Sequence, residues 1–191
     1  MPLNVPNLVT LSRILFIPII IGLYYLPEPW LSEPARNVAA TVLFIAAAST
    51  DWLDGYLARR LNQMSAFGAF LDPVADKLIV TGALVVLLYL NRVDMLVALI
   101  IIGREIAISA LREWMAKVGQ AKSVAVAFVG KLKTTMQMVA IPLLLYYDTA
   151  LFGLLDAQWL GTVLINVAAV LTVVSMLYYV RKALPHAAAP P

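Results

Sequence analysis

The segment Asp51-Trp-Leu-Asp54-Gly55-Tyr-Leu-Ala58-Arg59 is followed, eight residues later, by Gly68-Ala-Phe-Leu-Asp72-Pro-Val-Ala-Asp76. Together they place four aspartates in stretches that are otherwise apolar enough to lie in a membrane. An aspartate at the bilayer centre costs about 2.5–3.5 kcal/mol, so four facing lipid would cost roughly 10–14 kcal/mol. We therefore expect these side chains to face a polar cavity, a partner or a bound metal.

The composition of the whole chain favours a membrane protein. Of the 191 residues, 62% are hydrophobic and 13% are charged, whereas a soluble domain carries about 25% charged residues. Six apolar stretches approach the roughly 20 residues that a membrane-spanning helix needs: 8–26, 37–58, 66–90, 95–115, 131–147 and 157–180. We expect one all-α, polytopic membrane domain over residues 1–191, with six transmembrane helices and a disordered tail at 185–191.

The lysines and arginines predict the orientation of these helices. If the N-terminus is cytoplasmic, twelve of the fourteen basic residues lie on the cytoplasmic side or at span ends there, and only Arg36 and Arg92 lie outside. Cytoplasmic segments of membrane proteins carry such an excess of basic residues. We expect both termini to be cytoplasmic.

The spacing of the aspartates brings them together. Asp51 and Asp54 fall within about 100° of one helix face, and Asp72 and Asp76, four residues apart, form one stripe on the next helix. Because these helices run in opposite directions, both pairs lie near the cytoplasmic ends. Small residues allow the two helices to approach closely: Gly55, Ala58 and Gly68.

Four clustered carboxylates repel one another unless cations neutralise them. The chain has no cysteine, and its one histidine, His186, lies in a tail rich in proline and alanine. A purely oxygen-donor set favours Mg²⁺ or Mn²⁺ over zinc. Two ions would balance four carboxylates, and two-metal sites serve in-line displacement at phosphorus.

The two segments match the pattern of the CDP-alcohol phosphotransferase family, D-x₂-D-G-x₂-A-R-x₈-G-x₃-D-x₃-D, at all eight fixed positions. Asn4–Arg13 resembles the N-terminal segment of that family. Three further stretches are similar to the branch that uses glycerol 3-phosphate as acceptor: Gly103–Ala116, residues 123–126 and residues 130–138.

This resemblance implies a fold and a reaction. The fold is six transmembrane helices around a polar cavity open to the cytoplasm, usually in a homodimer. The reaction moves the phosphatidyl group of CDP-diacylglycerol to an alcohol and releases CMP. In this branch the alcohol is glycerol 3-phosphate, the product is phosphatidylglycerol phosphate, and the enzyme lies in the bacterial inner membrane with its active site facing the cytoplasm. We expect membrane lipid but no nucleic acid as a partner.

The resemblance also assigns roles on the donor side. Asp51, Asp54, Asp72 and Asp76 hold the metal ions, and Asp76 is also the general base that accepts the proton of the attacking hydroxyl. The remaining residues contact CDP-diacylglycerol: Asn7, Thr10, Arg13, Asp54, Gly55, Ala58, Arg59 and Gly68.

Each of these roles has a simpler alternative. Asp72-Pro73 could begin a helix, with the aspartate as N-cap, and Asp76 could be a metal ligand only. The two glycines, Gly55 and Gly68, could serve only helix packing, and the residues from Asn7 to Arg13 could anchor the chain at the membrane surface. Arg60 is more simply an anchor than a ligand.

Four basic residues are expected to bind the acceptor phosphate: Arg104, Arg112, Lys131 and Lys133. Arg104 and Arg112 are about 80° apart around a helix and can face one pocket, whereas Lys131 and Lys133 differ by about 200° and cannot both do so. The alternative is anchoring at the cytoplasmic face, and Glu105 and Glu113 could form structural ion pairs with the arginines.

The sequence leaves three alternative functions open for the whole chain. A sibling enzyme with another acceptor would share the motif, and inositol phosphate would suit the four basic residues equally well on charge. An ion-coupled transporter could use the aspartates as a relay, but it predicts paired repeats that the sequence does not show. An inactive structural subunit would not need an intact motif.

Overall fold

The computed structural model describes the backbone of residues 5–60, 66–117, 128–150 and 155–187. Within these ranges the side chains of 5–7, 51–60, 66, 69, 128–129, 149–150, 155 and 185–187 are not described. The described residues form six helices: α1 (Val5–Leu23), α2 (Glu33–Arg60), α3 (Ala66–Tyr89), α4 (Met95–Lys117), α5 (Phe128–Tyr146) and α6 (Ala157–Ala187). Between α5 and α6, two short antiparallel strands pair, β1 (Thr149–Ala150) and β2 (Leu155–Asp156). The predicted all-α class is confirmed, and the helices fall on the six apolar stretches.

Some helix ends differ from the predicted spans in either direction. α1 ends at Leu23, before the expected 26, because the chain turns at Tyr24 and Tyr25 ahead of Pro27. α6 continues to Ala187, into the tail that was expected to be disordered. Residues 188–191 lie outside the described residues.

Two aspartates begin the helices that follow turns. The Asp94 side chain accepts a hydrogen bond from the backbone N–H of Leu96 at 2.8 Å, and the Asp156 side chain accepts one from that of Trp159 at 2.9 Å. Both are N-caps, which satisfy backbone donors that have no partner within the helix. Before Asp94, the chain leaves α3 through Asn91, which has a φ of 55°. These local signals fix the turns at one end of the helix bundle.

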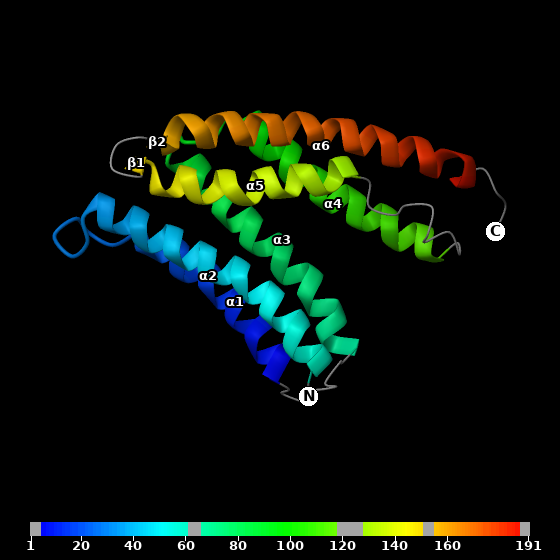
Figure 1. Cartoon of the computed structure of the whole chain (residues 1–191), viewed down its shortest axis with the longest axis horizontal. Helices are drawn as coiled ribbons and strands as arrows, with labels where there is room; N and C mark the ends of the chain where they lie inside the picture. Colours follow the sequence, from blue (N-terminus) through cyan, green and yellow to red (C-terminus); the bar gives the residue numbers. More distant parts are fainter. Residues whose placement is uncertain (1–4, 61–65, 118–127, 151–154, 188–191) are drawn as a thin grey trace.

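Figure 1 shows the helices as two groups of three, α1–α3 and α4–α6. The groups meet near the turns that join α1 to α2, α3 to α4 and α5 to α6, and they diverge toward their other ends. Glycines allow close packing within each group. A Cβ atom on Gly82 of α3 would lie 2.7 Å from Ile17 Cγ2 of α1, and one on Gly161 of α6 would lie 2.8 Å from Leu144 Cγ of α5.

The outer surface of the bundle is strongly apolar. Large apolar side chains are exposed on every helix, for example Leu15, Val42, Phe70, Leu99, Val139 and Val170. In the described part of the chain, Ala157–Leu184 is the one helix long and apolar enough to cross a membrane by itself, with a mean hydropathy of 2.2 and a third of its most apolar window buried. A soluble protein rarely exposes so much continuous apolar surface. The surface therefore indicates a membrane-associated protein.

A buried polar cluster ties the two groups together where they meet. We call Glu33, Asn37, Arg92 and Tyr147 the Arg92 cluster. The Arg92 guanidinium is buried and donates to Asn37 Oδ1 at 3.1 Å, to Glu33 Oε1 at 3.3 Å and to two carbonyl oxygens of α5 at 2.9 and 3.2 Å. It also lies 4.1 Å from the centre of the Tyr147 ring. Arg92 thus joins α2 and α5 to the α3–α4 turn, a burial that its predicted place on the outer side did not indicate.

Candidate functional site

One face of α3 carries two of the four motif aspartates, and α1 covers that face. Thr10 Oγ1 donates a hydrogen bond to Asp72 Oδ1 at 2.8 Å, and Arg13 forms an ion pair with Asp76. Thr10 and Arg13 are each only 1% exposed. The predicted aspartate stripe is therefore present, and the first helix contacts it directly.

These positions exclude two of the simpler alternatives. Asp72 lies inside α3, which begins at Ala66, so it is not the N-cap of that helix. Thr10 and Arg13 are buried against the acidic face of α3, so they do not anchor the chain at a membrane surface. Gly68 is buried on the same helix, where it is compatible with both of its proposed roles.

The other half of the motif lies on α2. The backbone of residues 51–60 is helical and belongs to this helix, which packs against α3. The side chains of Asp51, Asp54, Gly55, Ala58, Arg59 and Arg60 lie outside the described residues, as does that of Asn7. Among the side chains that are described, no group of three or more His, Cys, Asp or Glu could hold a metal ion. The meeting of all four carboxylates therefore stays a prediction.

A cavity of about 290 Å³ lies between the two groups of helices. It is lined by Arg13 and Asp76 on one side and by Glu105, Thr134 and Gln137 on the other, with residues of α2 between them. Five helices, α1 to α5, contribute to this lining. Apart from these groups and Lys77 the walls are mostly apolar, so the cavity offers a small number of directed polar contacts to a ligand.

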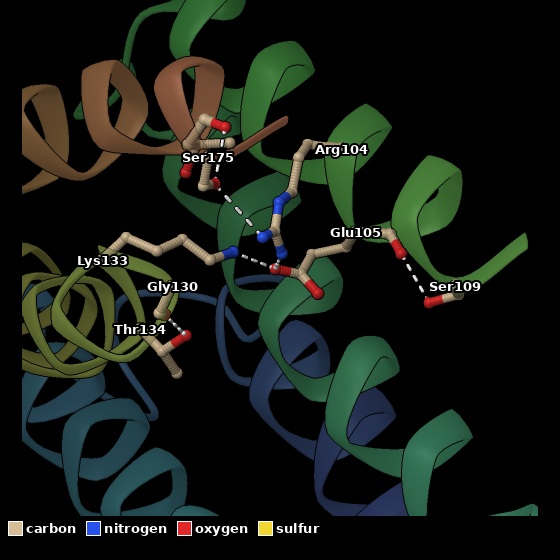
Figure 2. A network of polar contacts seen from close by, with 8 residues as sticks. Arg104, Glu105, Ser109, Gly130, Lys133, Thr134 and Ser175 are labelled. Carbon is tan, nitrogen blue, oxygen red and sulfur yellow. Dashed lines mark hydrogen bonds and ion pairs between the residues drawn. The ribbon is translucent and has the colours of Figure 1, made fainter. Parts of the chain in front are cut away.

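A charged network lies behind Glu105, which lines the cavity, and it joins α4, α5 and α6 (Figure 2). The Glu105 carboxylate lies between Lys133 of α5 and Arg104 of α4 and pairs with both. Arg104 also donates to Ser175 Oγ of α6 at 3.2 Å. Lys133 is 2% exposed and Arg104 is 6% exposed. Two cations against one carboxylate leave this buried network with a net positive charge, which suits an anionic ligand.

The four basic residues expected at the acceptor site are not equivalent. Lys133 points into the bundle, whereas Lys131 is exposed, as the angle between them predicts. Arg104 is buried and Arg112 is exposed, yet both guanidinium groups lie near the Tyr179 ring, at 5.8 and 5.9 Å from its centre. The structure therefore brings three of the four toward one region.

Some polar contacts in the structure were not predicted from the sequence, or were predicted only as alternatives. Glu105 forms the expected ion pair with Arg104, but Glu113 pairs with Lys117 at 2.9 Å and with no arginine among the described side chains. Gln137 and Ser175 were assigned no role, although both are buried. The available signal was a polar residue within an otherwise apolar span, which is costly unless it has a partner.

Comparisons with known proteins bear on the chemistry of this site. A family model described as CDP-alcohol phosphatidyltransferase matches residues 3–178. A protein of Escherichia coli (strain K12), named CDP-diacylglycerol--glycerol-3-phosphate 3-phosphatidyltransferase, is 48% identical over 185 residues, which cover 96% of each chain. A protein of Shigella flexneri serotype 5b (strain 8401) with the same name has the same identity and coverage.

Proposed function

This chain belongs to the CDP-alcohol phosphatidyltransferase family, and we propose that it transfers the phosphatidyl group of CDP-diacylglycerol to the sn-1 hydroxyl of glycerol 3-phosphate. The products are phosphatidylglycerol phosphate and CMP, so the enzyme serves phospholipid biosynthesis. The observation that carries this proposal is the 48% identity, over nearly the whole chain, to relatives named for that reaction. The intact motif and the buried positive network support it.

The acidic motif forms the donor side of the proposed site. Asp51, Asp54, Asp72 and Asp76 would hold two Mg²⁺ or Mn²⁺ ions, because carboxylate oxygens are the ligands that these cations prefer. When bound, the ions neutralise charge on the diphosphate of the donor. The donor contacts belong to α1, α2 and α3: Asn7, Thr10, Arg13, Asp54, Gly55, Ala58, Arg59 and Gly68.

Asp76 is the proposed general base. Its ion pair with Arg13 fixes the carboxylate at the cavity wall, where it can accept the proton of the sn-1 hydroxyl. The hydroxyl oxygen then attacks the β-phosphorus of the donor, and the bond to the departing CMP breaks. A positioned base of this kind contributes about 10²–10⁴-fold to a rate.

The positive network forms the acceptor side. Arg104, Arg112 and Lys133 are the main candidates for the phosphate of glycerol 3-phosphate, because arginine matches phosphate oxygens in geometry and charge. Lys131 faces away from Lys133 and would reach the ligand only from the rim. Inositol phosphate carries a similar charge, and the similarity to named relatives is what favours glycerol 3-phosphate over it.

The proposed setting is a bacterial inner membrane, with six spans, both termini in the cytoplasm and a homodimeric assembly. The apolar side chains exposed on all six helices support several spans, and the excess of basic residues on one side supports the orientation. The cavity then lies near the cytoplasmic half of the bundle, where the soluble acceptor and CMP can enter and leave.

A CMP-release assay tests this function. Purified protein in detergent receives CDP-diacylglycerol, Mg²⁺ and one alcohol from a panel of glycerol 3-phosphate, inositol phosphate, serine, choline and phosphatidylglycerol. We expect release with glycerol 3-phosphate alone. Release with a different alcohol would instead identify a sibling enzyme. Absence of release with every alcohol, together with cation flux in proteoliposomes, would identify a transporter.

A further inference from the structure

Gln137 is a buried polar residue whose amide oxygen has no hydrogen-bond partner among the described residues. Its side chain lies on α5 and is 3% exposed. Among the described residues, no donor reaches its Oε1 atom. A buried polar group without a partner destabilises a fold by about 1–3 kcal/mol, so native structures rarely keep one without a reason.

The position of Gln137 supplies that reason. It lines the cavity of about 290 Å³ together with Asp76 and Glu105, so a molecule in the cavity can reach its amide. It follows Lys133 by four residues, which places both side chains on one face of α5, about 6 Å apart along the helix axis. Lys133 belongs to the positive network, and Gln137 lies one helical turn further along α5.

We propose that the Gln137 amide binds the sn-2 hydroxyl of the acceptor, the hydroxyl that does not react, and so makes the enzyme specific for an acceptor that carries it. The proposal rests on the proposed function. In this arrangement the acceptor phosphate binds the positive network where Glu105 meets the cavity, and the three-carbon chain extends along the cavity, which Gln137 and Asp76 also line. Asp76 takes the proton of the reacting hydroxyl, and Gln137 holds its neighbour.

An amide suits this task because it can both accept and donate a hydrogen bond. The carbonyl oxygen and the NH₂ group exchange places by rotation about a terminal torsion with broad preferences, so either can face the hydroxyl. A cavity of this size admits water, which can satisfy the amide until the acceptor arrives. An acceptor without the middle hydroxyl would leave the buried amide unpaired, and sites of this type reject such analogues strongly.

The experiment compares two acceptors in the full-length enzyme. Glycerol 3-phosphate and 3-hydroxypropyl phosphate share the phosphate and the reacting hydroxyl, and they differ only in the middle hydroxyl. We expect the wild type to favour glycerol 3-phosphate by tenfold or more in kcat/KM. In Gln137→Met, which keeps the length of the side chain but removes its hydrogen bonds, the preference should fall to within about twofold of unity.

The control is Gln158→Met, at an exposed glutamine on α6 near the opposite end of the bundle. This variant should keep the wild-type preference. A preference that persists in Gln137→Met would overturn the inference, and so would a raised KM for CDP-diacylglycerol with the preference intact, because Gln137 would then contact the donor.

The wild type alone already provides a test that does not depend on how a variant folds. Equal use of the two acceptors would show that no residue recognises the middle hydroxyl, and it would overturn the inference while the proposed function stands. If glycerol 3-phosphate gives no CMP release at all, the proposed function fails first and the inference fails with it.

Discussion

The Arg92 cluster and the cavity are both polar regions inside an apolar bundle, but the protein satisfies them differently. Arg92 donates to two backbone carbonyls, an amide and a carboxylate and stacks near a tyrosine ring. At the cavity, by contrast, Gln137 Oε1 has no partner in the described part of the chain. Unused polar atoms beside a cavity mark the place where a ligand binds, whereas polar atoms that are fully paired mark a structural joint.

This difference predicts that changes at the cavity alter activity and that changes at the Arg92 cluster alter stability. Metal removal should have the largest effect. Treatment with EDTA should reduce CMP release to background, and Mg²⁺ or Mn²⁺ should restore it, because the motif offers only oxygen ligands. Zn²⁺ should restore it poorly, since zinc sites usually include nitrogen or sulfur. Full activity after exhaustive dialysis against EDTA would show that the reaction does not need a divalent metal.

Asp76→Asn should have the next largest effect, a loss of about 10²–10⁴-fold in kcat, since the amide cannot accept the proton of the hydroxyl. Binding of CDP-diacylglycerol, measured by calorimetry, should stay largely intact. The matched control is Asp94→Asn at the other end of the bundle, where asparagine can still cap α4. Loss of donor binding together with unfolding in Asp76→Asn would contradict its role as base.

Arg112→Ala should raise the KM for glycerol 3-phosphate by roughly tenfold and leave the KM for CDP-diacylglycerol nearly unchanged. The magnitude corresponds to the loss of one hydrogen bond to a charged group, about 1.5 kcal/mol. Lys117→Ala removes an exposed charge from the same helix and should change neither value. An equal rise in both KM values would show that Arg112 does not distinguish the acceptor from the donor.

Arg92→Met should have the smallest effect on catalysis, with kcat and both KM values within about twofold of wild type. The protein should nevertheless unfold at a lower temperature, because each carbonyl left without a donor costs about 1–3 kcal/mol. A thermal-unfolding scan in detergent measures this loss. An unchanged Tm together with a large change in KM would reverse the assignments of the two regions.

The sequence predicted the parts of this structure that depend on local spacing. The four-residue step from Asp72 to Asp76 placed both on one face of α3, and the structure shows α1 contacting both. The two-residue step from Lys131 to Lys133 predicted that only one would point inward. Such inferences need only the geometry of a single helix.

Contacts between distant segments could not be predicted in the same way. Arg92 lies in a turn, and the sequence predicts only that it is on the outer side; its burial depends on α2 and α5 meeting there. The role of Gln137, a single polar residue, could not be predicted from the sequence. Its unused oxygen and its place at the cavity depend on how five helices pack. Helix ends also shifted, since composition limits the length of a span but does not fix where it stops.

The central claim is that carboxylates from α2 and α3 share bound cations at the site. Anomalous diffraction from a crystal of the enzyme with Mn²⁺ and CDP-diacylglycerol tests it most directly. The account predicts manganese peaks within coordination distance of Asp51 or Asp54 on one helix and of Asp72 or Asp76 on the other. Manganese bound elsewhere, with these carboxylates too far apart to share an ion, would contradict it.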